Sequence, residues 1–185
     1  MNTNTLSTAE VRRPVVAEAA LREFAPGGYH GATVADVARE SRISPAYVFK
    51  LFPSKESLFV AALETCFAKV LVALADGADR AEGATPQAVL DEMGIAYAEL
   101  IRDRTLLMLQ VHAQSVAEVP EIGTALRAGL ASVTEFAQRR SGADDVAVQR
   151  FMAYGQLCHL IVTAQIDDLP TEWARLLATG IRHPA

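Results

Sequence analysis

Apolar residues recur every three or four positions along most of the chain, which is the spacing of helices that bury one face. Glycine and proline fall mainly between these periodic segments, where they end one helix and precede the next. No segment alternates with the period of a β-strand. The pattern therefore predicts an all-α fold with about nine helices. They are expected at residues 8–24, 33–40, 44–51, 55–75, 85–102, 104–117, 120–140, 143–166 and 171–180.

The expected helix starts carry residues that cap helices well. Thr33, Ser44 and Thr85 each precede a periodic segment, and a hydroxyl at that position accepts a free backbone N–H. Ser54 is also a good cap, but Ser57 stands three residues later in place of the glutamate of a full capping box. In the first segment Pro14 fits only an early turn, so that helix is expected to begin near residue 12.

Composition fits this picture and excludes several classes of protein. The chain has 185 residues, 33 of them alanine, and its 51% hydrophobic content excludes a wholly disordered chain. Cys66 and Cys158 lie in apolar helical segments, and two cysteines are too few for a disulfide framework, so we expect both to be buried in a reducing compartment. No uncharged apolar run is long enough to span a bilayer, and no secretory signal pattern is visible. We expect a cytoplasmic protein that does not bind membranes.

The charge is unevenly distributed along the chain. The formal net charge is −5, yet residues 1–55 carry a net charge of +2 and the remainder a net charge of −7. An acidic body argues against binding a polyanion with the whole surface. A slightly basic N-terminal part suits a protein that offers one end to a polyanion.

The segment 33–51 has the spacing of a helix-turn-helix motif. Two short helices are joined by the three residues Ser41-Arg42-Ile43. In such motifs the second helix enters the major groove of DNA, and the exposed start of this one carries modest side chains that fit there. A plain helical hairpin in a bundle core has the same spacing. The positions expected to face inward are Val34, Val37, Ala38, Ile43, Val48, Phe49, Leu51 and Phe52.

The residues around this motif resemble the N-terminal domain of the TetR (tetracycline-repressor-like) family of bacterial transcription regulators. The resemblance covers about residues 13–63 and implies two domains, a helix-turn-helix DNA-binding domain at 1–54 and a helical bundle for ligand binding and dimerisation at 55–185. The residues that carry it are Phe24, Gly28, Tyr29, Thr33, Val37, Ala38, Ser44, Phe49, Phe52, Pro53, Ser54, Lys55, Glu56 and Leu58.

The resemblance implies roles for individual residues. Thr33 would meet a DNA phosphate at the start of the second helix, and Lys55 would reach a phosphate from the start of the fourth. Lys50 would point toward the DNA backbone or groove. The positions that would face base edges and flanking phosphates are Ser44, Pro45, Ala46 and Tyr47.

The motif departs from the family pattern at several positions. Arg42 occupies the turn position usually held by glycine, where a left-handed backbone costs about 1 kcal/mol, which a phosphate contact by Arg42 would offset. Phe49 and Leu51 lack the polar groups usual at their positions, and Pro45 donates no hydrogen bond. We therefore expect fewer polar contacts to DNA than is typical. An alternative function stays open: a ligand-binding or interaction bundle that has lost operator binding.

The resemblance also implies a homodimer formed through the eighth and ninth helices. Trp173, Leu176 and Leu177 either anchor that interface or close the core of the monomer. The family's variable domain usually holds a ligand, here expected to be small and hydrophobic or aromatic. Candidate ligand-binding residues are polar or polarisable groups on apolar helices, which could equally be core residues: Tyr97, Met108, His112, Met152, Gln156 and His159.

No pattern indicates catalysis. None of the four histidines follows an acidic residue by three positions, so the Glu-x-x-His pair of helical di-iron sites is missing. The sequence has no His-Glu-x-x-His, phosphate-binding loop or Gly-x-Ser-x-Gly motif. We expect no enzyme, metal or cofactor. The favoured function is a DNA-binding transcriptional regulator that represses until its ligand binds.

Overall fold

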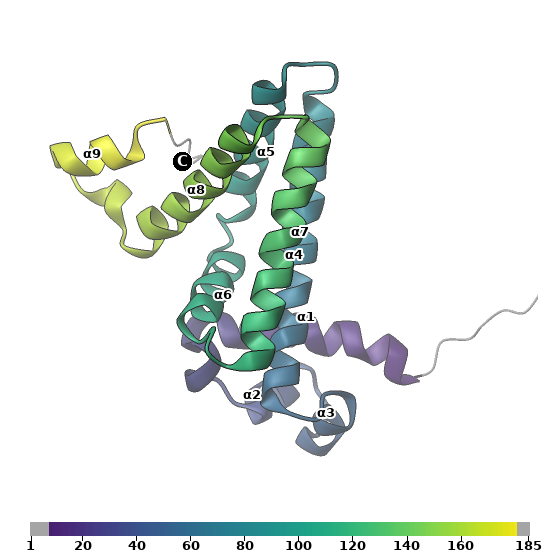
Figure 1. The fold of residues 1–185 in the computed structure, drawn as a ribbon. Helices are drawn as coiled ribbons and strands as arrows, with labels where there is room; N and C mark the ends of the chain where they lie inside the picture. Colours follow the sequence, from purple (N-terminus) through teal and green to yellow (C-terminus); the bar gives the residue numbers. More distant parts are fainter. Residues whose placement is uncertain (1–7, 181–185) are drawn as a thin grey trace, which may run out of the picture. The chain divides into compact units, whose positions relative to one another are not determined.

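The structure is a computed structural model that describes residues 8–180, and within this range it is helical without strands (Figure 1). The expected order of helices is confirmed. The elements are α1 (Thr8–Gly31), α2 (Val34–Glu40), α3 (Pro45–Leu51), α4 (Lys55–Arg80), α5 (Pro86–Leu100), α6 (Arg104–Ser115), α7 (Pro120–Ser141), α8 (Asp145–Thr163), the 3-10 turn η1 (Ile166–Asp168) and α9 (Glu172–Ala178).

Two of the expected helices have different bounds in the structure. α1 begins at Thr8 and runs through Pro14, so the expected start near residue 12 was wrong. A proline this early removes a hydrogen bond from an exposed turn only. α1 continues past Phe24, and its helical geometry breaks at Gly28, where φ is 66°. α4 extends to Arg80, five residues beyond its expected end.

The described chain forms two compact units. One contains the described residues up to Cys66 together with Met108–Arg127, and the other contains Phe67–Leu107 together with the described residues from Ala128 onward. α4, α6 and α7 contribute to both units. The predicted domain boundary between residues 54 and 55 coincides with the start of α4 and stays a prediction about domain function.

The first unit is built around α1, α2 and α3, which pack against one another. Phe24 of α1 and Phe59 of α4 are fully buried and meet edge to face, with 4.9 Å between ring centroids. Val37 and Ala38 are the buried residues of α2. Both were expected to face inward, and this is confirmed.

The second unit places α5 against α8. Met93 and Leu107 are fully buried there. A Cβ atom on Gly77 of α4 would lie 2.6 Å from the carbonyl oxygen of Glu92, so the close contact between α4 and α5 requires glycine. α8, η1 and α9 share a small apolar cluster formed by Ile161, Ile166 and Ala174, with Leu157 and Leu177 packed against it.

Among the described residues, α4 is the one helix long and apolar enough to cross a membrane by length and composition. This stretch contains Glu64 and Lys69, so the expectation that no uncharged apolar run is long enough to span a bilayer is not contradicted. Leu58, Phe59, Leu63 and Leu74 of this helix are buried within the protein. Length and composition alone do not distinguish such a helix from the core helix of a globular protein.

Candidate nucleic-acid interface

The start of α2 is closed by a capping box between Thr33 and Asp36. The Thr33 hydroxyl oxygen accepts the backbone N–H of Asp36 at 3.2 Å. In return, Asp36 Oδ2 accepts the backbone N–H of Thr33 at 2.9 Å and its hydroxyl at 2.6 Å. The hydrogen bonds from Thr33 lower the pKa of the Asp36 carboxyl below its usual value. Both donors of Thr33 are thus engaged within the protein, and a phosphate at this position would share them.

The turn between α2 and α3 is a Schellman motif built without glycine. Arg42 has a φ of 55°, in the left-handed region. Its N–H bonds to the carbonyl of Arg39 at 3.1 Å, and the N–H of Ile43 bonds to the carbonyl of Ala38 at 3.0 Å. The left-handed conformation anticipated from the family pattern is present, and the Arg42 side chain is exposed.

The N-terminal end of α3 is open to solvent. Ser44 caps the helix by accepting the backbone N–H of Tyr47 at 3.2 Å, and Pro45 occupies the first helical position. Ser44, Pro45 and Ala46 are exposed, whereas Tyr47 is half-buried. The fixed φ of proline and the serine cap hold this short helix without tertiary contacts from the exposed side.

The opposite side of α3 partly contradicts the sequence expectation. Val48, Leu51 and Phe52 are buried as expected, but Phe49 is 47% exposed. At 3.6 residues per turn, Phe49 lies roughly 160° around the helix from the buried Leu51. Phe49 therefore lies on the outer face of α3, as does the exposed Lys50.

Arg13 of α1 holds the C-terminal end of α3, a role that sequence reasoning missed. Its Nη1 donates a hydrogen bond to the backbone carbonyl of Leu51. Its guanidinium carbon lies 4.6 Å from the centre of the Phe52 ring, in cation–π geometry. Arg13 and Leu51 are 38 positions apart in the chain, and no local pattern indicates such a contact.

The start of α4 has a reciprocal cap made of two serines. Ser54 Oγ accepts the N–H of Ser57 at 3.0 Å, and Ser57 Oγ accepts the N–H of Ser54 at 3.1 Å. The expectation that this cap lacks its second half was wrong, because a serine hydroxyl replaces the glutamate carboxylate.

Lys55, the first residue of α4, lies against Tyr29. Its Nζ atom is 4.9 Å from the centre of the Tyr29 ring. The Tyr29 hydroxyl donates a hydrogen bond to Glu56, which raises the pKa of Tyr29 to about 12 and lowers the pKa of Glu56. Both the tyrosine ring and the neighbouring carboxylate compensate a lysine that the positive end of the helix dipole disfavours.

The candidate ligand-binding residues separate into two groups. Tyr97 of α5 and His159 of α8 form a hydrogen bond of 2.5 Å within the second unit. Met152 is half-buried there, and Gln156 is exposed. Met108 and His112 belong to the first unit. The sequence therefore identified one side-chain pair that meets, and two residues of α6 that belong elsewhere.

His159 is held in its neutral form. Burial lowers its pKa to about 4, because removing the ring from water disfavours the charged form. Nε2 faces the Tyr97 hydroxyl, whereas Nδ1 is buried with no hydrogen-bond partner among the described residues. The pair thus leaves one buried polar atom unsatisfied.

His112 packs against the break in α1. A Cβ atom on Gly28 would lie 2.7 Å from His112 Nδ1, so the ring requires glycine at this position. His112 Nε2 is buried and has no partner within residues 8–180. The glycine cluster at 27–28 therefore serves close packing against α6, with a left-handed φ that glycine tolerates.

The two cysteines are buried and form no disulfide, as expected. Burial raises the pKa of Cys158 to about 11. A thiol with so high a pKa is a poor nucleophile. The described residues contain no group of three or more His, Cys, Asp or Glu side chains placed to hold a metal ion.

Comparison with known proteins assigns the first unit's helices to a family. The family model described as "Bacterial regulatory proteins, tetR family" matches residues 16–62, which include α2, the Schellman turn and α3. A curated relative from Bacillus subtilis (strain 168), the uncharacterized HTH-type transcriptional regulator YuxN, is 24% identical over 112 residues. The TetR family model therefore matches the helix-turn-helix region of this chain and the helices beside it, between residues 16 and 62.

The match to the curated relative covers 60% of this chain but only 38% of the relative's length. Solved TetR-type structures share the fold over most of the chain. A TetR-family regulator from Agrobacterium tumefaciens superposes with a TM-score of 0.70 at 16% identity, covering 95% of this chain and 96% of that one. FadR from Bacillus subtilis, solved in complex with stearoyl-CoA, gives 0.67 at 15% identity, covering 92% and 98%.

Proposed function

We propose that the protein is a sequence-specific DNA-binding repressor that acts as a homodimer and is released by a small hydrophobic or aromatic ligand. The observation that carries the proposal is the exposed N-terminal end of α3, where Ser44, Pro45 and Ala46 face solvent beside Tyr47. A single helix with modest side chains fits the major groove of B-DNA, which is about 12 Å wide.

Base contacts come from the first turn of α3, and phosphate contacts come from the residues around it. Ser44 and Tyr47 supply hydroxyl groups to base edges, while Pro45 and Ala46 add apolar contact. Arg42 and Lys50 are exposed cations on either side of this turn. Thr33 and Lys55 approach the DNA backbone from the starts of α2 and α4. Few of these groups donate hydrogen bonds to bases, so one subunit alone binds weakly.

A second subunit supplies the second half-site. Large apolar side chains are exposed on the C-terminal half of α8 and on α9, with Leu160 and Trp173 each 51% and Leu176 73% accessible. Leu177 instead packs on the apolar cluster of α8, η1 and α9. We assign Leu160, Trp173 and Leu176 to a two-fold dimer interface, because the centre of a homodimer interface is usually formed by apolar side chains that cluster on neighbouring elements.

The Tyr97–His159 pair supplies the polar part of the ligand site. A neutral imidazole with an unsatisfied Nδ1 atom favours an uncharged ligand group that donates or accepts one hydrogen bond. Two proteins of similar fold have been solved with small molecules: FadR from Bacillus subtilis in complex with stearoyl-CoA, and the multidrug binding protein EbrR in complex with imidazole.

DNA binding is tested by fluorescence anisotropy with a labelled fragment from the region upstream of the protein's own gene. We expect binding that weakens steeply with salt, because the released counterions make the affinity salt-dependent. The matched control is a shuffled fragment of equal length and composition. Equal affinity for both fragments, or binding to neither, would instead favour the ligand-binding or interaction bundle without an operator.

A further inference from the structure

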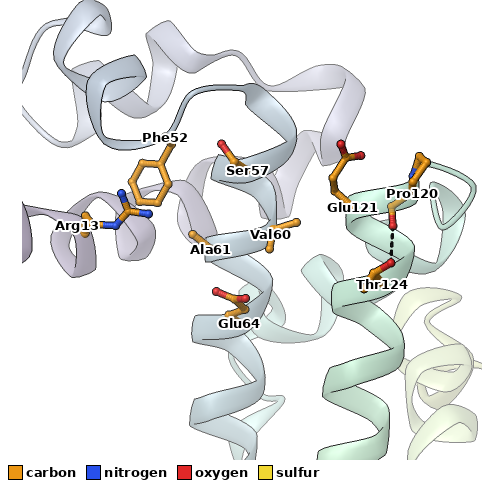
Figure 2. A pocket seen from close by; sticks show the side chains of 9 residues that line it. All are labelled: Arg13, Phe52, Ser57, Val60, Ala61, Glu64, Pro120, Glu121 and Thr124. Carbon is orange, nitrogen blue, oxygen red and sulfur yellow. Dashed lines mark hydrogen bonds between the residues drawn. The ribbon is translucent and has the colours of Figure 1, made fainter.

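A groove of about 580 Å³ opens on the first unit, between the end of α3, the first half of α4 and the start of α7 (Figure 2). None of the six candidate ligand-binding residues lines it. The half-buried Val60 and Ala61 of α4 give it an apolar surface, and the otherwise buried Phe52 borders it. The groove is therefore separate from the Tyr97–His159 pair, which belongs to the second unit.

Carboxylates stand on two sides of this apolar surface. Glu64 projects from α4, and Glu121 projects from the first turn of α7. The positive end of the α7 dipole favours the ionised form of Glu121. Both side chains are exposed, and neither forms an ion pair with another residue of the described chain.

The one cation of the groove is engaged elsewhere. Arg13 donates to the Leu51 carbonyl and lies over the face of Phe52. Its charge is therefore engaged at the end of α3, where Figure 2 shows the guanidinium beside the Phe52 ring. The groove combines an apolar surface with two unpaired negative charges and a hydroxyl group from Thr124 that already donates to the Pro120 carbonyl at 2.8 Å.

We propose that this groove binds an amphipathic organic cation. The apolar body of the ligand covers Val60 and Ala61, and its positive charge lies between Glu64 and Glu121. An anion of the same shape would meet two carboxylates and is excluded. The inference stands independently of the repressor function, because it concerns a site that neither the DNA contacts nor the Tyr97–His159 pair uses.

A ligand in the groove contacts the two side chains that fix the end of α3. Arg13 and Phe52 line the groove and also hold the C-terminal end of that helix. Ligand binding in the groove would therefore act directly on α3, the helix that we assign to DNA binding. No change in the second unit is needed for this effect.

The test uses two probes of the same shape and opposite charge, tetraphenylphosphonium and tetraphenylborate, titrated into the full chain by isothermal calorimetry. We expect the cation to bind and the anion to bind at least tenfold more weakly. Glu64→Gln and Glu121→Gln should each weaken cation binding about two- to fivefold, the range for exposed charge pairs, and the double variant about tenfold. Neither substitution touches a buried residue, and melting curves verify the fold.

Two controls make the result decisive. Glu118→Gln removes an equal charge from an exposed glutamate that does not line the groove, and it should leave binding unchanged. Tyr97→Phe alters the second unit and should also leave it unchanged. Equal binding of both probes, equal losses in Glu118→Gln, or a loss confined to Tyr97→Phe would each overturn the proposal.

Discussion

The helix-turn-helix and the α8–η1–α9 segment differ in how their helix ends are capped and in how much apolar side-chain surface they expose. In the former, Thr33, Ser44 and Ser54 cap successive helices and Arg13 holds the end of α3. In the latter, Thr171 makes no capping hydrogen bond from its side chain, and Leu160, Trp173 and Leu176 are exposed. Local hydrogen bonds close the helix ends of the first region, whereas the second exposes the apolar side chains that we propose for a dimer interface.

The largest expected effect comes from charging the exposed apolar side chains of the second region. The double variant Leu160→Glu/Leu176→Glu should raise the dimer dissociation constant at least ~100-fold, because each apolar side chain and its two-fold copy lose their burial. Light scattering coupled to size-exclusion chromatography measures this. The matched control is Val72→Glu, at a valine of α4 that is 62% exposed. If the double variant stays dimeric, α8 and α9 do not form the interface.

As the pH falls, the stability that depends on the second region should be lost at a higher pH than the stability that depends on the first. Burial lowers the pKa of His159 from 6.5 to about 4. Between pH 6.5 and pH 4, His159 is therefore protonated in the unfolded chain and neutral in the folded chain. The free energy of unfolding therefore falls as pH drops from about 6.5 to 4, by roughly 2–3 kcal/mol.

Urea unfolding measured at several pH values from 7 to 4 checks this expectation, with His159→Gln as the control that lacks the titrating ring. Asp36 and Glu56, whose pKa values are lowered in the first region, contribute their losses only at more acidic pH. Parallel pH profiles for the two proteins would show that burial of His159 does not couple folding to protons.

Tyr47→Ala tests whether the exposed end of α3 in the first region contacts DNA. We expect operator affinity to fall by about tenfold, a loss of one to two contacts, while the dimer and the melting temperature stay unchanged. Anisotropy titrations give the affinity, and Tyr47→Phe separates the hydroxyl from the ring. Unaltered affinity in Tyr47→Ala would remove this residue from the DNA interface.

The smallest expected effect compares the two left-handed residues that are not glycine, one in each region. Arg42 has a φ of 55° and Gln165 a φ of 53°. Replacing either residue with glycine relieves the steric cost and should raise the free energy of unfolding by about 0.5–1 kcal/mol. Only Arg42→Gly should also weaken DNA binding. It should reduce the slope of log affinity against log salt concentration by about one. Equal DNA binding in both variants would show that Arg42 contacts no phosphate.

Local features of this chain were predictable from its sequence because they depend on neighbouring residues. The caps at Thr33, Ser44 and Thr85 and the bounds of α2 and α3 follow from residue types within a few positions. Phe49 was misplaced because hydrophobicity alone does not show how many positions a seven-residue helix can bury. The sites outside the helix-turn-helix depend on contacts between distant segments.

Arg13 and the ligand candidates illustrate those distant contacts. Nothing around Arg13 indicates that its guanidinium reaches Leu51 at the far end of the motif. Residue type marked both His112 and His159, but periodicity cannot tell that one packs on Gly28 and the other bonds to Tyr97. The groove beside Glu64 and Glu121 likewise exists only once α4 and α7 are brought together.

The account depends most on the exposed end of α3 meeting base edges in DNA. Binding the full chain to a random pool of DNA fragments, washing at moderate salt and sequencing the retained fragments tests this directly. The account predicts enrichment of a two-fold symmetric sequence with half-sites one helical turn, or a multiple of it, apart, and loss of that enrichment in Tyr47→Ala. Retained fragments with no common sequence, or the same sequence retained by Tyr47→Ala, would contradict it.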